Sequence, residues 1–349
     1  MKIMKKKKIL FISSSSVHTK KMIDMLEGYF DIYLITNNKD IFQGSQIKNI
    51  FIWKKNKIAN ILYTFKILKE IKVDLIAIQQ LGLLAFFYLL LLHRKYEVLL
   101  TAWGSDILIF PYRSWKNMLI VRFSLKKATY LSTVNSIGMI STMKCLSNFK
   151  KEVIPIELGI SNYIEFEADF TEKENIIFSP RGHIDLYNIE NIILSFLEFK
   201  KKNTDWKLYI AGLEDPINTL KYRELVNELK IENDVKFCGN LPPKEYSEIM
   251  KKSKIVVSIP CSDGRPITVM EAISSNCTLI CSDILANREL VSNRVNGFLV
   301  NPLELFDLNI YWSIDIDLQT KYNYKISNLF QYEEAKRNYI TLFKKILKK

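Results

Sequence analysis

The sequence has 349 residues and a mass of 40.9 kDa, enough for about two domains of about 150 residues each. With 48% hydrophobic and 25% charged residues but only 11 glycines and 9 prolines, the composition is globular and excludes collagen-like and linker-rich chains. The net charge of +13 is concentrated in residues 1–160, which contain 25 Lys or Arg against 10 Asp or Glu, whereas residues 161–349 contain 25 against 27.

In the first half of the chain, short apolar segments alternate with helical patterns. The apolar segments are continuous runs, which is typical of parallel strands covered on both faces. Strands that alternate with helices predict right-handed βαβ units in a doubly wound sheet. The predicted strands are residues 8–13, 31–36, 49–53, 74–79, 97–102, 129–133 and 152–155, and the predicted helices are 20–28, 58–71, 82–94, 115–127 and 136–146.

The pattern restarts after an acidic segment, residues 161–174, which we interpret as a linker. We therefore expect one domain at 1–160, a second at 175–327, and a C-terminal helix at 328–349 that packs back on the first domain. The expected fold is α/β, with two Rossmann-like doubly wound domains that face a central cleft. In the second domain the predicted strands are 175–179, 206–211, 235–238, 255–259, 278–281 and 297–300, and the helices, with the terminal one, are 188–202, 216–229, 243–251, 266–275 and 333–348.

Two apolar segments resemble targeting or membrane signals, and both are too short. The basic N-terminus is followed by only four apolar residues, 9–12, fewer than a signal peptide needs. The longest apolar run, 81–92, is shorter than the roughly 18 residues of a membrane-spanning helix. It is either a helix buried on the sheet or an edge that dips into a membrane beside a basic face. That face would consist of Arg113, Lys116, Arg122, Lys126 and Lys127.

The cysteines and histidines exclude a disulfide framework and argue against zinc. The five cysteines include no C-x-x-C pair, and none of the three histidines lies near such a pair. This usage indicates a reducing, cytoplasmic compartment. An acidic pair, Asp315 and Asp317, lies in a late connecting segment and is not expected to bind a metal.

The basic first half predicts an anionic partner. A lipid surface, a lipid-linked phosphate and nucleic acid all fit the charge, and a Lys-rich composition without a role is the alternative. No motif of a nucleic-acid reader is present, so we expect no nucleic-acid partner. The expected location is cytoplasmic and peripheral at the inner face of the membrane.

The most informative segment joins the predicted strand at 255–259 to the helix that follows Pro266. Proline suits a helix start, and the next amides, at 267–269, would be donors at the positive end of the helix. Such a site suits a diphosphate. Asp263 lies in the loop and Glu271 on the second turn, so two carboxylates flank the helix start. The alternative is that Asp263 caps the helix and Glu271 lies on a solvated face.

This segment, SIPCSDGRPITVMEAISSNCTLICSDILANRELVSNRVNGFLVNP, resembles the donor-site signature of family 4 glycosyltransferases, retaining enzymes with the GT-B fold. The signature has two acids separated by seven residues, which Asp263 and Glu271 match. Further matches are Ala272, Ser282, Asp283, Glu289, Asn296 and Gly297, and upstream Phe237, Gly239 and Asn240. The resemblance is strong over 175–300. In the first half it is clearest at TAWGSDI (101–107), which is similar to bacterial surface-polysaccharide members.

The resemblance implies a role for each matching residue. Glu271 would bind the donor ribose, Arg181 would neutralise the leaving diphosphate, and Asp263 would lie against the donor sugar. Asn240 and Leu241 would border the nucleobase. The complete donor side comprises Arg181, Gly239, Asn240, Leu241, Asp263, Gly264, Arg265, Pro266, Ile267, Thr268 and Glu271. The nucleotide-diphosphate sugar would be a substrate, and no cofactor or metal is expected.

The acceptor side is expected in the first domain. Asp106 is a candidate to orient or deprotonate the acceptor, and the alternative is a cap for the helix from Ile107. His18 would lie in the cleft or else on the surface. The acceptor-side candidates are His18, Trp103, Gly104, Ser105 and Asp106.

Two departures from the signature leave a second function open. The first acid is Asp263 where the family usually has Glu, and Leu186, followed by Tyr187, stands where the family usually has Lys. His183, Arg265 or Lys244 are candidates to replace that charge. The leading expectation is a transferase that moves a sugar to a lipid-linked or polysaccharide acceptor in cell-surface glycan or lipopolysaccharide synthesis. The alternatives are a non-catalytic sugar-nucleotide-binding subunit and, less favoured with three histidines, a nucleotide-sugar epimerase.

Overall fold

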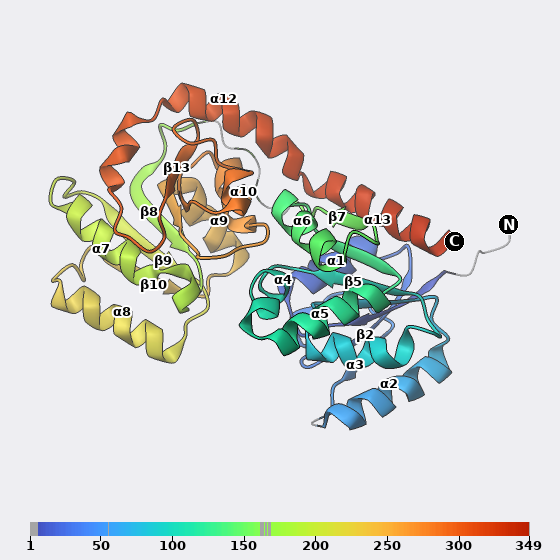
Figure 1. The fold of residues 1–349 in the computed structure, drawn as a ribbon. Helices are drawn as coiled ribbons and strands as arrows, with labels where there is room; N and C mark the ends of the chain where they lie inside the picture. Colours follow the sequence, from blue (N-terminus) through green and yellow to red (C-terminus); the bar gives the residue numbers. More distant parts are fainter. Residues whose placement is uncertain (1–5, 55, 161–163, 165, 167–168, 349) are drawn as a thin grey trace. The chain divides into compact units, whose positions relative to one another are not determined.

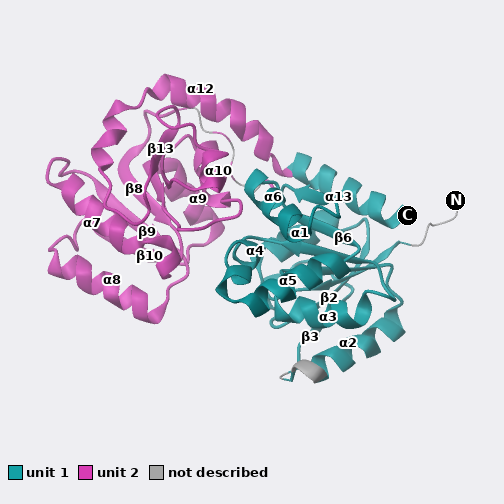
Figure 2. Ribbon diagram, in the orientation of Figure 1, with its two compact units in different colours: residues 1–158, 333–349 teal, residues 159–332 magenta. Residues whose placement is uncertain are grey.

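The computed structural model describes residues 6–54, 56–160, 164, 166 and 169–348. Two compact units divide the chain: unit 1 comprises residues 1–158 and 333–349, and unit 2 comprises residues 159–332 (Figure 2). The predicted linker at 161–174 lies partly outside the described residues. Ile164, within this segment, and Ile160, just before it, are buried in the core of unit 2.

Unit 1 is a seven-stranded parallel sheet in the order β3-β2-β1-β4-β5-β6-β7 (Figure 1). The order reverses between β1 and β4, so the loops that follow these two strands diverge at a topological switch point. The strands are β1 (Lys8–Ile12), β2 (Asp31–Thr36), β3 (Asn49–Ile52), β4 (Leu75–Gln79), β5 (Val98–Ala102), β6 (Tyr130–Val134) and β7 (Val153–Ile156).

The helices of unit 1 cover both faces of this sheet. Leu10 and Ile12 of β1 face the core shared with α2, α3 and α5, whereas the ring of Phe11 faces the C-terminal helix α13. The alternation puts successive side chains on opposite faces, and both faces are apolar because both are covered. The helices are α1 (Val17–Leu26), α2 (Lys57–Ile71), α3 (Leu83–Leu92), α4 (Ser105–Leu108), α5 (Trp115–Lys127), α6 (Ile137–Leu146) and α13 (Tyr332–Lys348).

The C-terminal helix α13 joins unit 1 through its apolar face. Its Phe343 ring lies 6.3 Å from that of Phe11 and 6.1 Å from that of Phe30, measured between centroids. Tyr339 packs on Phe343 within the helix. Unit 1 is therefore built from both ends of the chain.

Unit 2 is a six-stranded parallel sheet in the order β10-β9-β8-β11-β12-β13. Helices α7 and α8 cover one face, and α9 and α10 cover the other (Figure 1). The strands are β8 (Glu174–Pro180), β9 (Lys207–Ala211), β10 (Val235–Gly239), β11 (Ser253–Ser258), β12 (Thr278–Ser282) and β13 (Gly297–Val300). The helices are α7 (Ile189–Lys200), α8 (Pro216–Glu228), α9 (Pro243–Lys252), α10 (Ile267–Ser274), α11 (Leu285–Arg288) and α12 (Ile316–Ser327).

Every strand and helix predicted from the sequence is present, with ends that differ by up to three residues. The two-domain α/β prediction is thus confirmed. The apolar helix α3 is not wholly buried, however. Tyr88 and Leu89 face the core, whereas Leu90 is 47% exposed and Leu83 and Leu91 are exposed beside it. In the described part of the chain, no helix combines the length and apolar character that crossing a bilayer requires.

Candidate functional site

The predicted donor-side residues of unit 2 gather where β8 and β11 end. Arg181 directly follows β8, and its Nη2 lies 2.8 Å from Oδ2 of Asp263. The two side chains are only 12% and 16% exposed, so the pair is partly desolvated and stronger than a surface ion pair. The Arg181 Nη1 lies 3.5 Å from the hydroxyl of Thr268, on the first turn of α10. One guanidinium therefore links the loop acid to the helix start.

Helix α10 begins after Pro266, as predicted, and one of the three predicted donor amides is already used. The amide of Val269 donates to the carbonyl of Pro266 at 3.0 Å. The amides of Ile267 and Thr268 precede this bond and stand at the positive end of the helix dipole. Together with the guanidinium of Arg181, they form an electropositive site that suits a diphosphate.

Glu271 is held by a tyrosine that sequence reasoning missed. The hydroxyl of Tyr246, on α9, donates to Oε2 of Glu271 at 2.9 Å, and the Glu271 side chain is buried. The Tyr246 ring packs edge-on against Phe178 of β8. Glu271 is therefore not on a solvated face. No spacing in the sequence marks Tyr246, because a tyrosine on the apolar face of a helix looks like an ordinary core residue.

A second residue missed from the sequence is Gly212, at the end of β9. A Cβ atom at this position would lie 2.6 Å from the carbonyl carbon of Arg181, and its φ is +130°. Its amide donates to the carbonyl of Gly239 at 2.8 Å. Gly212 thus brings the end of β9 against the backbone of Arg181 and links it to the end of β10. Of the two predicted base-side residues, Asn240 is exposed and Leu241 packs in the apolar cluster that includes Tyr246.

The residue after Leu186, the position where the family usually has a lysine, makes an aromatic contact with Arg181. The guanidinium carbon of Arg181 lies 4.2 Å from the ring centroid of Tyr187. Leu186 belongs to the same short turn, and its carbonyl accepts the amide of Cys261 at 3.0 Å. Tyr187 adds no positive charge but fixes the plane of the Arg181 guanidinium by a cation–π contact.

Of the three substitutes considered for that lysine, His183 is excluded. It is fully buried, its Nδ1 lies 2.7 Å from the hydroxyl of Thr219, and burial lowers its pKa. Nη1 of Arg265 lies 3.7 Å from Oε2 of Glu289. The preceding residue, Gly264, is buried. Lys244 is exposed on the first turn of α9.

In unit 1, two acceptor-side candidates stack on each other. The ring of His18, on α1, lies 5.1 Å from that of Trp103 at an interplanar angle of 13°. His18 is exposed, and Trp103 is half-buried with an indole Nε1 that has no hydrogen-bond partner among the described residues. A flat aromatic surface with an adjacent unpaired N–H can receive the face and a hydroxyl of a sugar ring.

Asp106 is not positioned as the acceptor base. Its side chain is 4% exposed, and both carboxylate oxygens accept backbone amides. Oδ1 accepts from Trp103 at 3.0 Å and from Gly104 at 2.9 Å, while Oδ2 accepts from Leu81 at 2.9 Å. Burial raises the pKa of Asp106, and the three amides oppose the rise. Asp106 therefore joins the β4–α3 and β5–α4 loops. It does not cap α4, since it lies on the first turn of that helix.

No metal cluster is present in the described part of the chain, and one buried thiol, Cys281, is unreactive. No three His, Cys, Asp or Glu side chains converge there in a way that could hold a metal ion. Asp315 accepts the amide of Leu318 at 3.0 Å as the N-cap of α12. Burial raises the pKa of the Cys281 thiol to about 12, so this thiol stays protonated at neutral pH.

Family models match both units. The model described as "Glycosyl transferases group 1" matches residues 162–307, and the model "Glycosyl transferase 4-like" matches residues 8–135. The first range contains the Arg181–Asp263 pair and Glu271. The second contains the His18–Trp103 stack.

Curated relatives and solved structures agree with this assignment. The chain is 25% identical over 140 residues to the UDP-N-acetylglucosamine–peptide N-acetylglucosaminyltransferase GtfA subunit of Streptococcus agalactiae, covering 36% of this chain and 27% of that protein. It is 27% identical over 112 residues to alpha-monoglucosyldiacylglycerol synthase of Streptococcus pneumoniae, covering 32% and 25%. The match thus spans about a quarter of the length of these relatives.

Among solved structures, Anabaena HepE in complex with UDP-glucose superimposes with a TM-score of 0.78 at 15% identity, covering 97% of this chain and 99% of that chain. A likeness at this identity establishes the fold. The chain therefore has the GT-B fold, with a domain in unit 1 that matches the glycosyl transferase 4-like family and a domain in unit 2 that matches the glycosyl transferases group 1 family.

Proposed function

We propose that this protein transfers a sugar from a nucleotide-diphosphate donor to a lipid-linked or polysaccharide acceptor, with retention and without a metal ion. The observation that carries the proposal is the Arg181–Asp263–Thr268 cluster at the start of α10, inside the group 1 match. Negative charge grows on the diphosphate as it leaves, and preorganised donors at that place stabilise the transition state. The reaction belongs to cell-surface glycan synthesis in this proposal.

Retention is supported by the surroundings of Asp106. This carboxylate is buried and both of its oxygens accept backbone amides, so it is not open to the acceptor hydroxyl. In the proposed step, the acceptor oxygen bonds to the anomeric carbon on the face from which the diphosphate departs. The bond from that carbon to the phosphate oxygen breaks, and the hydroxyl proton passes to the leaving phosphate. The leaving group thus acts as the base, and no carboxylate is required.

A donor panel tests this function. UDP-, GDP-, ADP- and CMP-sugars are incubated with the protein, and nucleotide release and thermal shift are measured. Glu271→Ala removes the proposed ribose ligand, and we expect about a tenfold to hundredfold loss in kcat/KM, the effect of about 1.5–3 kcal/mol from hydrogen bonds to a charged group. Tyr246→Phe removes the hydroxyl that holds Glu271 and is expected to cause a smaller loss. Full release by a folded Glu271→Ala variant contradicts the proposed site.

A second candidate function is a non-catalytic subunit that binds nucleotide sugars. Leu186 at the position of the usual lysine favours it, because the diphosphate then loses one cation. Stabilisation by one donor without release of nucleotide, even with lipid and glycan acceptors added, would identify this function. Release of nucleotide would exclude it.

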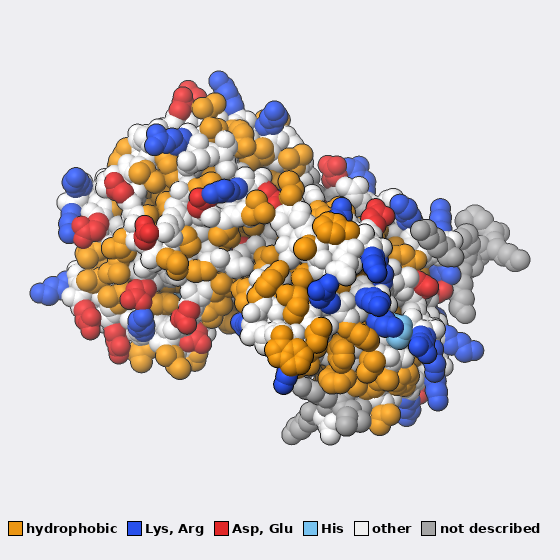
Figure 3. Space-filling model, in the orientation of Figure 1, with side chains coloured by type: hydrophobic (Ala, Val, Ile, Leu, Met, Phe, Trp, Pro, Cys, Tyr) orange, Lys and Arg blue, Asp and Glu red, His pale blue; other side chains and the backbone are white. Residues whose placement is uncertain are grey.

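We also propose that unit 1 binds an anionic membrane surface at the inner face of the membrane. Figure 3 shows hydrophobic side chains gathered over α3 and α5 with Lys and Arg beside them. The exposed apolar residues there include Leu90, Trp115 and Leu119. A pocket of about 490 Å³ at the C-terminal end of α5 is lined by cations and apolar side chains, namely Leu119, Arg122, Phe123, Leu125, Lys126, Leu146, Ser147, Asn148, Lys150 and Lys151.

Vesicle sedimentation tests the membrane proposal. Each Lys or Arg near an anionic leaflet contributes about 1 kcal/mol, and salt screens this attraction. We expect binding to phosphatidylglycerol-containing vesicles and little binding to phosphatidylcholine alone. Reversal of two charges, by Arg122→Glu with Lys126→Glu, is expected to weaken binding at least tenfold. The matched control Lys202→Glu, in unit 2, leaves it unchanged. Binding that is indifferent to lipid charge or to these variants would contradict the proposal.

A further inference from the structure

A second site lies in unit 1, in a pocket of about 370 Å³ between the ends of β1 and β4. This is the switch point of the sheet, where open α/β folds bind ligands. The pocket is lined by Ile12, Ser13, Ser14, Trp53, Ile78, Gln79, Gln80, Leu81, Gly82, Leu83, Leu84, Ala85, Ser105, Asp106, Phe110 and Arg113. Most of these residues were not singled out from the sequence.

The polar side of this pocket contains unpaired hydrogen-bonding groups. Gln79 is 4% exposed, and neither its amide nitrogen nor its amide oxygen has a hydrogen-bond partner among the described residues. The indole Nε1 of Trp53 is also buried without a partner there. Buried amide groups are almost always paired, and leaving one unpaired costs about 1–3 kcal/mol per group. A ligand that both donates to and accepts from Gln79 would remove this cost, and a sugar hydroxyl does both.

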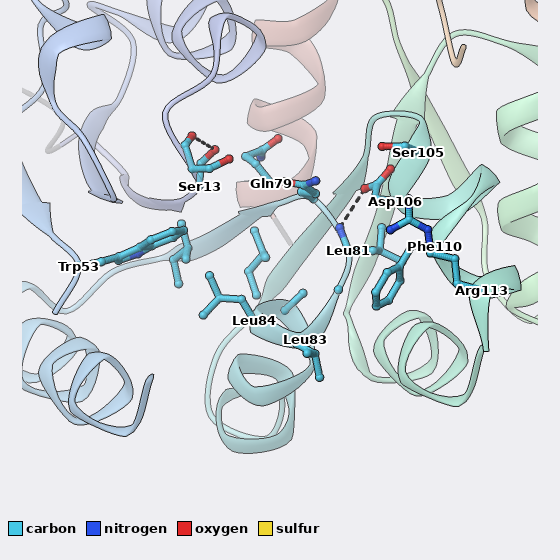
Figure 4. A pocket seen from close by; sticks show the side chains of 16 residues that line it. Ser13, Trp53, Gln79, Leu81, Leu83, Leu84, Ser105, Asp106, Phe110 and Arg113 are labelled. Carbon is cyan, nitrogen blue, oxygen red and sulfur yellow. Dashed lines mark hydrogen bonds between the residues drawn. The ribbon is translucent and has the colours of Figure 1, made fainter. Parts of the chain in front are cut away.

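The opposite side of the pocket is apolar and continues onto an exposed helix. In Figure 4, Ser13, Gln79, Ser105 and Asp106 lie along one side, and Leu83 and Leu84 lie along the other. Leu83 begins α3, and seven and eight residues later Leu90 and Leu91 are also exposed on this helix. Positions seven apart lie on one helical face, so an apolar track leads from the pocket along α3.

We infer that this pocket binds a sugar that is attached to an aliphatic chain, with the sugar hydroxyls at Gln79 and Trp53 and the chain along Leu83 and α3. The inference rests on the proposed function and narrows its acceptor to a lipid-borne sugar. Trp53 offers an aromatic wall and a donor, and Gln79 offers both donor and acceptor, which is the chemistry that recognises a sugar ring. A free polysaccharide would not cover the track on α3 and would lack the favourable free energy that comes from burying its apolar area.

Binding of octyl glucoside to the full chain tests the inference without any donor. Octyl glucoside is titrated below its critical micelle concentration, and binding is followed by tryptophan fluorescence. Trp53→Phe identifies the part of the signal that comes from Trp53, and a titration with free glucose serves as the comparison. We expect octyl glucoside to bind at least tenfold tighter than glucose. Gln79→Leu preserves the size of the side chain but removes the amide, and it is expected to lower the affinity for octyl glucoside at least tenfold. Leu83→Ser is expected to abolish the difference in affinity between octyl glucoside and glucose. The matched control Leu318→Ser, on α12, is expected to leave this difference unchanged.

Arg113 at the pocket edge separates two sources of such a ligand. A neutral glycolipid has no charge for Arg113, whereas a sugar linked through phosphate has one. The second compound is a glucose–octyl phosphodiester. If the natural ligand is linked through phosphate, Arg113→Ala is expected to weaken binding of the phosphodiester more than binding of octyl glucoside. Equal effects on both compounds favour the neutral glycolipid.

The outcomes also separate this inference from the proposed function. Wild-type binding by Gln79→Leu, or equal affinity for glucose and octyl glucoside, overturns the inference, even if the donor panel shows turnover. Binding with the expected pattern supports the inference, even if no donor is consumed, in which case the proposed transfer fails alone.

Discussion

Replacement of Arg181 by alanine is expected to lower kcat/KM for the nucleotide-sugar donor by about 100- to 1,000-fold, the loss seen when one preorganised charge-stabilising donor is removed. The guanidinium stands at the start of α10, 2.8 Å from Asp263. Its removal takes away a cation and also leaves the largely buried Asp263 carboxylate unpaired beside the proposed diphosphate position. Steady-state nucleotide release with the preferred donor measures the loss.

Two further variants separate these effects. Arg181→Ala combined with Asp263→Ala removes the unpaired carboxylate and is expected to recover part of the affinity for the donor but not the rate. Arg181→Lys keeps the charge but loses the planar contact with Tyr187 and is expected to fall between wild type and alanine. Arg223, which pairs with Glu214 and stacks on Phe237, is the matched control on the surface of the same unit. A comparable loss of kcat/KM in Arg223→Ala would show that removing either arginine acts through the stability of unit 2, and it would contradict a direct role of Arg181 at the donor.

Gly212→Ala is expected to destabilise unit 2 by about 2–5 kcal/mol, from a positive φ and from overpacking together. The new methyl group would meet the backbone of Arg181 at 2.6 Å. Because that backbone belongs to residues 181 and 182, the collision is expected to displace the guanidinium that we propose binds the diphosphate. Donor affinity is therefore expected to fall together with the midpoint of urea unfolding.

Gly44→Ala controls for the backbone conformation. Gly44 has a φ of +87°, and a Cβ there would have no heavy atom within 4 Å. This variant keeps the conformational cost, about 1–2 kcal/mol, without a collision. Equal losses of stability in the two variants, or an unchanged donor affinity in Gly212→Ala, would contradict the proposed link between β9 and Arg181.

Strands and packed helices could be predicted from the sequence because their signal is local. Helix α12 was missed because its buried side is polar. Gln319 and Asn323 are fully buried, and they bond to Thr278 and Asn296 instead of filling an apolar core. A helix whose inward face consists of amides has no apolar stripe, so periodicity cannot reveal it.

The Asp263–Glu271 part of the proposed donor site could be predicted because loop and helix are adjacent in sequence. The spacing of Asp263 and Glu271 along one strand–helix turn is enough to place them. Tyr246 and Gly212 come from other elements, and only the folded sheet brings them to the site. Gln79 could not be predicted from the sequence either. Its amide lacks a hydrogen-bond partner among the described residues because of the side chains that the fold places around it, and these are not its neighbours in the chain.

The placement of α13 in unit 1 has a consequence for biosynthesis. Phe343 covers Phe11 and Phe30, but the whole of unit 2, residues 159–332, is synthesised between them. Domains generally fold as units while the chain is made. Unit 2 can therefore fold before α13 is made, whereas the sheet of unit 1 keeps one apolar face uncovered until α13 emerges from the ribosome. The nascent chain thus exposes the apolar surface around Phe11 and Phe30 throughout the synthesis of unit 2.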